Sequence, residues 1–297
     1  MTATKDRKKS RCRPTPCHGV GRRIRGIAMS VITISRGSFS GGKMLAECLA
    51  KRLGYRCIDR DVIVERAAAQ GVSQDELRDA LEKPPGFLDR FSHKRYKYLA
   101  LFQAALTEEV RTGKVIYHGL AGQLLLGGGR HILRTRLIAP MDVRIQMVHE
   151  RLNYSKSESI AYIEKMDEQR RRWTSFLYGV DWGDPMLYDL VLNLDHMTIE
   201  TVCKIISTAV HQRCFELTPA CRQALGELAL ASKVRAALAV TSATENLELE
   251  ATAKDGVVAL KGKLATAYQL EEVRRIAMGI PGVIDLDLDR LLPPVQE

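Results

Sequence analysis

Short apolar runs alternate with amphipathic segments over the first two thirds of the chain. Apolar residues at helical spacing predict helices, and short uninterrupted apolar runs predict buried strands. Strands separated by helices are typical of a parallel sheet covered on both faces. The predicted strands span residues 31–35, 56–58, 115–117, 136–138 and 190–193. The predicted helices span residues 42–52, 62–70, 74–82, 94–112, 143–154, 156–172 and 199–211.

The pattern changes towards the end of the chain. It lapses over residues 213–223, which contain Pro219, and we expect a linker there. Asp255-Gly256 then stands between two alternating runs, which is a strong signal for a β-hairpin. The following elements complete a helix–strand–strand–helix–strand module of α+β type. They are predicted at residues 228–238, 247–253, 257–262, 268–278 and 283–288.

These segments divide the chain of 297 residues into four parts. This length suits one large domain or two modest ones. We expect a disordered basic tail at 1–28 and an α/β domain at 29–212. A linker at 213–225 would then lead to the small α+β module at 226–292.

The net charge of +10 is concentrated at the start of the chain. Residues 1–26 contain nine Lys or Arg and one Asp, so the tail carries +8 and the remaining chain only +2. Pro, Arg, Lys and Gly without a periodic apolar face are typical of disorder. Nucleic-acid binding is therefore not expected except through this tail. Met29 directly precedes the first strand, which leaves an over-extended start and a functional basic arm both open.

Cysteine usage and hydropathy favour the cytoplasm. Seven cysteines are scattered without a disulfide framework, as in proteins of a reducing compartment. Cys12, Cys17 and His18 lack a second ligand pair nearby, which favours free thiols over a zinc site. No apolar run approaches the ~20 residues needed to cross a bilayer, so no transmembrane segment is predicted.

The strongest chemical signal follows the first predicted strand. Gly37, Gly42 and Lys43 fit the phosphate-binding pattern G-x-x-x-x-G-K. Glycines let backbone N–H groups face phosphates, and the start of the next helix adds positive potential. Met44 stands where a Ser or Thr hydroxyl would help to hold Mg²⁺. The alternative is a plain strand–turn–helix, but the buried strand and helix around the motif favour phosphate binding.

Charged residues follow the second strand. Strand ends in a parallel sheet face the ligand crevice. Asp59 is therefore a candidate to meet Mg²⁺-bound water or a nucleoside hydroxyl, and Arg60 to reach a phosphate. For Asp61 we favour the role of cap for a helix that starts at Val62.

Further charges lie near the last strand of the sheet. Arg170, Arg171 and Arg172 cannot share one helix face, because neighbours point about 100° apart. One or two of them could close over transferring phosphates, and a solvated helix end is equally open. Asp189 begins a buried strand, so its carboxylate needs a partner, either a ligand hydroxyl or a nearby arginine.

With these segments in order, residues 30–210 resemble the cytidylate kinase-like branch of the P-loop nucleoside monophosphate kinases. The resemblance implies a P-loop parallel sheet flanked by helices. It also implies transfer of the γ-phosphoryl group of ATP, with Mg²⁺, to a nucleoside monophosphate, CMP or dCMP being favoured. It rests on residues 35–43, Ile58-Asp59-Arg60-Asp61, Ile138-Ala139-Pro140 with Arg144, Asp167-x-x-Arg170 and Tyr188-Asp189-Leu190-Val191-Leu192-Asn193.

The resemblance also implies roles for single residues. Lys43 and Arg170 would be catalytic, and Arg170, Arg171 and Arg172 would form the lid. No direct protein ligand is implied for Mg²⁺, which phosphates and water would hold, with Asp59 as one candidate. The ATP phosphates would be bound by Gly37, Ser38, Ser40, Gly41, Gly42 and Lys43, and the acceptor by Asp59, Arg60 and Asp189.

Three residues depart from the family pattern: Met44, His118 and Leu120. Many of these kinases carry an acid at the position of His118 and an arginine at that of Leu120. A catalytically weak nucleotide-binding protein that signals through its C-terminal module therefore remains an alternative.

The C-terminal module resembles a BON domain. The resemblance rests on residues 255–262 and on Ile280-Pro281-Gly282-Val283. It implies a binding module without catalytic chemistry, with a protein or a lipid surface as ligand. Because the module carries little basic charge, we favour regulation or protein contact over membrane binding.

Overall fold

The computed structural model describes residues 30–82, 94–119, 121–127 and 129–292. The predicted basic tail at 1–28, with Cys12, Cys17 and His18, lies outside the described residues, as does Leu120. Among the helices that are described, none combines the length and the apolar character needed to cross a membrane.

A five-stranded parallel sheet forms the centre of the larger region, as the sequence predicts. The strand order is β2-β3-β1-β4-β5, so β1 and the loop that follows it lie in the middle. β4 starts four residues earlier than predicted, because the alternation of apolar and polar positions extends back to Ile132. The strands are β1 Val31–Arg36, β2 Arg56–Asp59, β3 Val115–His118, β4 Ile132–Ile138 and β5 Leu190–Asn193.

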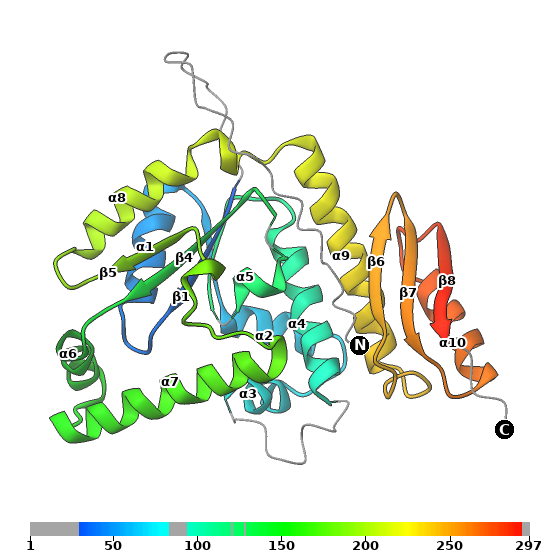
Figure 1. Cartoon of the computed structure of the whole chain (residues 1–297), viewed down its shortest axis with the longest axis horizontal. Helices are drawn as coiled ribbons and strands as arrows, with labels where there is room; N and C mark the ends of the chain where they lie inside the picture. Colours follow the sequence, from blue (N-terminus) through cyan, green and yellow to red (C-terminus); the bar gives the residue numbers. More distant parts are fainter. Residues whose placement is uncertain (1–29, 83–93, 120, 128, 293–297) are drawn as a thin grey trace, which may run out of the picture.

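Helices cover both faces of this sheet (Figure 1). Neighbouring residues of β1 divide between the faces: Ile32 packs in the core under α1 and α8, and Val31 in the core under α2, α4 and α5. This alternation explains why the successive residues Val31 and Ile32 are both apolar and fully buried. The helices are α1 Gly42–Leu53, α2 Arg60–Ala68, α3 Gln74–Glu82, α4 Lys94–Val110, α5 Gly122–Leu125, α6 Met141–Leu152, α7 Lys156–Tyr178 and α8 Ile199–Val210.

Helix α9 spans Pro219–Val240 and so begins inside the predicted linker. The prediction of irregular structure is wrong from Pro219 onwards. The Thr218 side chain accepts a hydrogen bond from the Cys221 backbone, and proline suits the first helical turn because its missing N–H would have no partner there. The pairing of cap and proline was a readable helix start, which the lapse in apolar spacing obscured.

Helix α9 also joins the two sheets. Its Leu225 and Ala236 pack in the core of the parallel sheet, whereas Val234 and Leu238 pack in the core of the C-terminal module. Apolar residues on more than one face are typical of a helix buried on both sides. In Figure 1, α9 accordingly lies between α4 and β6.

The C-terminal module is a mixed three-stranded sheet packed against helices. β6 pairs antiparallel with β7, and β7 pairs parallel with β8. The predicted hairpin is confirmed: Asp255 and Gly256 both have positive φ, of 51° and 84°, as a tight two-residue turn requires. The elements are β6 Glu250–Lys254, β7 Val257–Lys263, α10 Ala267–Met278 and β8 Asp285–Leu292.

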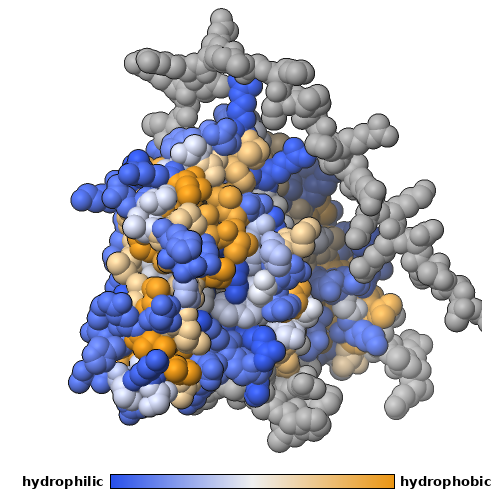
Figure 2. Space-filling model, turned by 60° about the vertical axis from the view of Figure 1, so that its left-hand side comes forward, coloured by the Kyte–Doolittle hydropathy of each residue, from blue (hydrophilic) through white to orange (hydrophobic). Residues whose placement is uncertain are grey.

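Figure 2 brings the side of α8 and β5 forward and shows apolar areas among hydrophilic ones. β5 is an edge strand of the parallel sheet, and its Val191 is 43% exposed. Charged and polar neighbours surround such residues, as is common on protein surfaces.

Candidate functional site

The loop between β1 and α1 has the shape that its glycines allow. Gly41 is the N-terminal cap of α1 and has a φ of 75°, which side chains rarely adopt. A Cβ atom on Gly37 would lie 2.8 Å from the Ser40 hydroxyl oxygen. A Cβ on Gly42 would lie only 1.8 Å from Cδ of Arg36. The three glycines therefore permit a left-handed turn and two close approaches.

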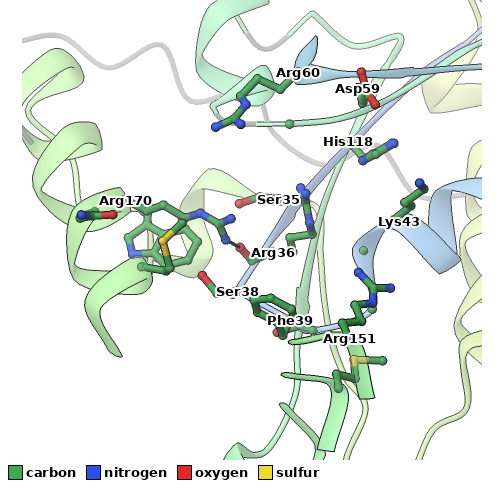
Figure 3. Close-up of a pocket in the computed structure, with 18 of the residues that line it drawn as sticks. Ser35, Arg36, Ser38, Phe39, Lys43, Asp59, Arg60, His118, Arg151 and Arg170 are labelled. Carbon is green, nitrogen blue, oxygen red and sulfur yellow. Dashed lines mark hydrogen bonds between the residues drawn. The ribbon is translucent and has the colours of Figure 1, made fainter. Parts of the chain in front are cut away.

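This loop forms one wall of a cavity of about 470 Å³ at the carboxyl edge of the sheet. The other walls come from the ends of β2 and β3 and from α6 and α7. Figure 3 shows Lys43 and His118 on the side of the cavity that faces away from Arg170. The predicted residues that line it are Ser38, Ser40, Gly41, Gly42, Lys43, Asp59, Arg60 and Arg170.

Several buried polar atoms beside the cavity lack a partner. Among the described residues, the Ser38 and Ser40 hydroxyls and Nδ1 of His118 are buried and make no hydrogen bond. A buried polar atom left unpaired costs about 1–3 kcal/mol. Such atoms gathered at one cavity indicate a site prepared for a polar ligand.

A charge pair fixes the loop against helix α7. Asp167 accepts a hydrogen bond from the Ser38 backbone N–H at 2.9 Å and from Arg144 at 2.5 Å. Nε of Arg144 donates to the Ser38 carbonyl oxygen at 2.8 Å. Asp167 and Arg144 thus hold both backbone groups of one loop residue, which ties the position of the loop to that of α7.

Arg170 is the one arginine of the predicted lid triplet that reaches the cavity. Its guanidinium donates to the carbonyl oxygen of Arg36 at 3.2 Å (Figure 3). Burial lowers the pKa of Arg170 to about 10, and neighbouring Arg36 adds to the effect, so the group stays charged at neutral pH. Arg171 and Arg172 are exposed and pair with Glu168 instead. The expectation that they belong to the site is not supported by their position.

Of the two carboxylates after β2, Asp59 rather than Asp61 caps the next helix. Helix α2 begins at Arg60, and Asp59 is its cap, accepting a hydrogen bond from the Val62 backbone at 3.0 Å. The preference for Asp61 as the cap is therefore wrong, because the helix starts two residues earlier than predicted. Asp59 and Asp61 both line the cavity, so capping does not remove Asp59 from it.

Asp189 lies apart from the other candidates. Its carboxylate accepts from the backbone and from both Nε and Nη2 of Arg134, at 2.8, 3.1 and 2.8 Å. The hydrogen bond to Asp189 in turn raises the pKa of Arg134. Asp189 does not line the cavity. Of the two partners that the sequence left open, the structure provides the arginine, and the assignment to the acceptor site is corrected.

His118 ends β3 beside Asp59 of β2, with which it is in register. Burial lowers the pKa of His118, and the positive charge of Arg36 lowers it further, so its imidazole is neutral at pH 7. A neutral ring can donate one hydrogen bond and accept another but cannot replace the charge of an acid.

The cavity is also lined by residues to which the sequence analysis assigned no role of their own, among them Arg36, Arg151 and Trp182. The Arg136 guanidinium lies over the Trp182 ring, 4.3 Å from its centroid, and donates to the Trp182 carbonyl. No local motif identifies Trp182 or Arg151. Arg36 did carry a signal, because it is the last residue of the strand that leads into the phosphate-binding loop.

Comparisons with known proteins find matches for two parts of this chain. Residues 31–196 match the model of the cytidylate kinase-like family, and residues 227–287 match the BON domain. Cytidylate kinases of Pyrococcus horikoshii and Thermococcus kodakarensis are each 29% identical to this chain over 182 residues. These matches cover 61% of this chain and 88% and 87% of the relatives. A crystal structure of an uncharacterized protein from Eubacterium ventriosum is 17% identical, covers 62% of this chain and 99% of its own, and gives a TM-score of 0.49.

Proposed function

Because the chain belongs to the cytidylate kinase-like family, we propose that it transfers the γ-phosphoryl group of ATP to a nucleoside monophosphate. CMP or dCMP is the acceptor that we favour, on the similarity to cytidylate kinases. The observation that carries the proposal is the cavity itself. There the phosphate-binding loop, the unpaired hydroxyls of Ser38 and Ser40, and the cations of Lys43 and Arg170 converge.

Phosphoryl transfer to a nucleoside monophosphate requires positioning of the reactants and stabilisation of charge rather than a strong base. In phosphoryl transfer, charge develops on the oxygens of the moving group, and fixed cations stabilise it. In our proposal the loop and Lys43 hold the ATP phosphates, and Arg170 stabilises the moving phosphoryl group. The phosphate of a nucleoside monophosphate is already ionised at neutral pH, so the acceptor needs no proton removed. Asp59 and Arg60 would contact the acceptor.

The residues present fit Mg²⁺ held through phosphates and water. Met44 offers no oxygen, but the carboxylates of Asp59 and Asp61 line the cavity and are the hard oxygen groups that Mg²⁺ prefers. When bound with ATP, the ion neutralises charge on the phosphate oxygens. Asp59 would act on it through water, because one carboxylate oxygen already caps α2.

A nucleotide panel tests the proposal. The purified protein is mixed with ATP, Mg²⁺ and one of the common nucleoside monophosphates, and ADP formation is followed. We expect turnover with CMP or dCMP that is faster than with purine nucleotides and is lost in the Lys43→Ala variant. ADP formation no greater than that of Lys43→Ala with every acceptor would end the kinase proposal.

The second candidate is a nucleotide-binding regulatory protein that signals through its C-terminal module. The packing of α9 in both cores favours this second candidate, since any shift of that helix would change the packing of both regions. Arg235 of α9 donates to Gln103 of α4 at 2.8 Å, and Gln103 donates to the Leu125 carbonyl of α5. This candidate predicts ATP binding by calorimetry without turnover, together with altered hydrogen exchange in residues 250–292. Turnover with any acceptor in the panel would favour the kinase.

For the C-terminal module, residues 226–292 in our division of the chain, we propose protein contact in the cytoplasm rather than lipid binding. Acidic and basic side chains alternate on its strands, such as Glu250 beside Lys261, without a basic patch that would attract an anionic membrane. Sedimentation with vesicles of anionic phospholipid tests the alternative, which is binding of the module to lipid. Binding to these vesicles, but not to neutral ones, would contradict our proposal.

A further inference from the structure

Arg36 occupies an unusual position directly before the phosphate-binding loop. It is the last residue of β1, and its side chain folds back over the loop rather than away from it. The stem is so close that a Cβ atom on Gly42 would lie 1.8 Å from Cδ and 2.7 Å from Nε of Arg36. Gly42 is therefore needed to admit the Arg36 side chain, in addition to any role in phosphate binding.

The head of this side chain faces the cavity. Arg36 lines it together with Lys43, and Figure 3 draws the two around the same space. Within the described residues, no hydrogen bond or ion pair of the Arg36 guanidinium is present. The nearby carboxylate of Asp59 caps α2 instead. Burial lowers the pKa of Arg36; the positive charges of Arg60 and Arg151 act in the same direction, and Tyr117 and Asp59 oppose them.

Three arginines on the neighbouring strands and helix have partners, whereas Arg151, which also lines the cavity, is exposed. Arg144 pairs with Asp167, Arg134 pairs with Asp189, and Arg136 is held by the carbonyl and ring of Trp182. A cation held against other cations is unfavourable unless an anion compensates it. Arg36 is half-buried and its head lines the cavity without such a partner, which points to an anionic ligand.

We infer that Arg36 is a phosphate-binding residue, whose guanidinium donates to phosphoryl oxygens of the bound nucleotide beside Lys43. The nature of the ligand rests on the proposed function, whereas the need for an anion rests on the geometry alone. A guanidinium matches phosphate oxygens in a two-pronged manner. Arg36 thus supplies a second fixed cation to a loop in which Met44 provides no hydroxyl.

Calorimetric titration with ATP tests this role without requiring turnover. Arg36→Met keeps an aliphatic side chain over Gly42 but removes the charge. Arg36→Lys keeps the charge but loses the planar guanidinium, which can donate two parallel hydrogen bonds. Arg52→Met, at an exposed arginine of α1, is the matched control. We expect ATP to bind on the order of 10- to 100-fold more weakly to Arg36→Met, with Arg36→Lys between it and wild type. The control should bind like wild type.

Melting temperature of the ligand-free protein separates ligand binding from a structural role. Because a half-buried cation with other cations near it does not stabilise the empty protein, Arg36→Met should melt at the wild-type temperature or above it. The inference is overturned if Arg36→Met binds ATP as Arg52→Met does. It is also overturned if both Arg36 variants melt well below wild type and Arg36→Lys keeps full affinity.

The outcome is independent of the kinase proposal. If no acceptor gives ADP but Arg36→Met still loses affinity for ATP, the kinase proposal fails and the role of Arg36 stands. If the wild type is an active kinase and Arg36→Met matches it in affinity and rate, the role of Arg36 fails alone.

Discussion

The parallel sheet and the C-terminal sheet differ in the polar groups that they leave without partners. At the carboxyl edge of the parallel sheet, as far as the structure describes the chain, Ser38, Ser40 and His118 have buried polar atoms without a hydrogen bond, and the Arg36 side chain lines the same cavity. In the described residues 211–292, every buried side-chain nitrogen and oxygen has a partner. Among the described residues, only the first region therefore leaves buried polar atoms available to a ligand at a cavity.

This difference does not come from loose attachment of the C-terminal sheet. α9 packs in both cores, and Arg235 joins it to Tyr96 and Gln103 of α4 at 3.0 and 2.8 Å. Lys233 of α9 also pairs with Glu108 of α4 at 2.9 Å. Both regions are thus well packed. The larger region also has unpaired polar atoms away from the cavity, such as both ring nitrogens of His131, so the gathering of several such atoms at one cavity is what indicates a ligand there.

The largest expected effect comes from the site. Arg170→Met should lower turnover on the order of 10³-fold, because arginines that stabilise transferring phosphoryl groups contribute at least this much. The measurement is ADP formation at saturating ATP and acceptor, with Arg52→Met as the control. A loss of less than tenfold would mean that Arg170 only supports the Arg36 carbonyl that it contacts.

In the C-terminal region we expect the reverse pattern. Leu260 is 1% exposed in the core of the small sheet. Leu260→Ala should reduce the free energy of unfolding by about 2–5 kcal/mol in chemical denaturation. ATP affinity of the folded protein should not change. Val257→Ala, at a position 38% exposed on the same strand, is the control and should cost less than about 0.5 kcal/mol. A tenfold change in ATP affinity for Leu260→Ala would contradict the view that the C-terminal core contributes to stability and not to ATP binding.

A smaller effect is expected where the loop meets α7. Asp167→Asn leaves Arg144 without its counter-charge and weakens the hold on Ser38. We expect a loss of about 1–3 kcal/mol in stability and roughly tenfold in ATP affinity. Glu164→Gln, at an exposed position one turn earlier on α7, should change neither. If both variants behave alike, the contacts of Asp167 do not position the loop.

The smallest effect concerns pH. His131 is 3% exposed, and burial lowers its pKa below the value of the unfolded chain. The unfolded state therefore takes up a proton first as pH falls. The resulting stability is complete above the unfolded pKa of about 6.5 and is lost at up to about 1.4 kcal/mol per pH unit below it.

His131→Leu should flatten this dependence between pH 7.5 and 5.5, as followed by urea denaturation. Residues 226–292 contain no histidine, so the acid sensitivity from histidine should belong to the larger region. An unchanged slope in His131→Leu would assign the sensitivity to other groups, with His118 as the next to replace.

Local patterns in the sequence determined much of this protein. The five strands, the glycine loop before α1 and the hairpin at Asp255-Gly256 depend on neighbouring residues, so they could be read directly. The phosphate-binding pattern could be recognised for the same reason, since a strand end and a helix start define it, and its residues Ser38 to Lys43 line the cavity. The start of α9 is also set locally, by the Thr218 cap and Pro219, but the apolar spacing around it does not have a helical period and so predicts a linker.

Only the tertiary structure decided which charged groups meet. Asp189 pairs with Arg134, 55 residues away, and the Ser38 backbone with Asp167, 129 residues away. Helix spacing and strand ends place the backbone, but a long charged side chain can reach several partners, and the packing of distant elements selects one. Lys43 and Arg170 could be identified from the sequence because they belong to recognisable motifs. The position of the Arg36 head beside Lys43 depends on the packing of β1, α1 and α7, so only the tertiary structure shows it.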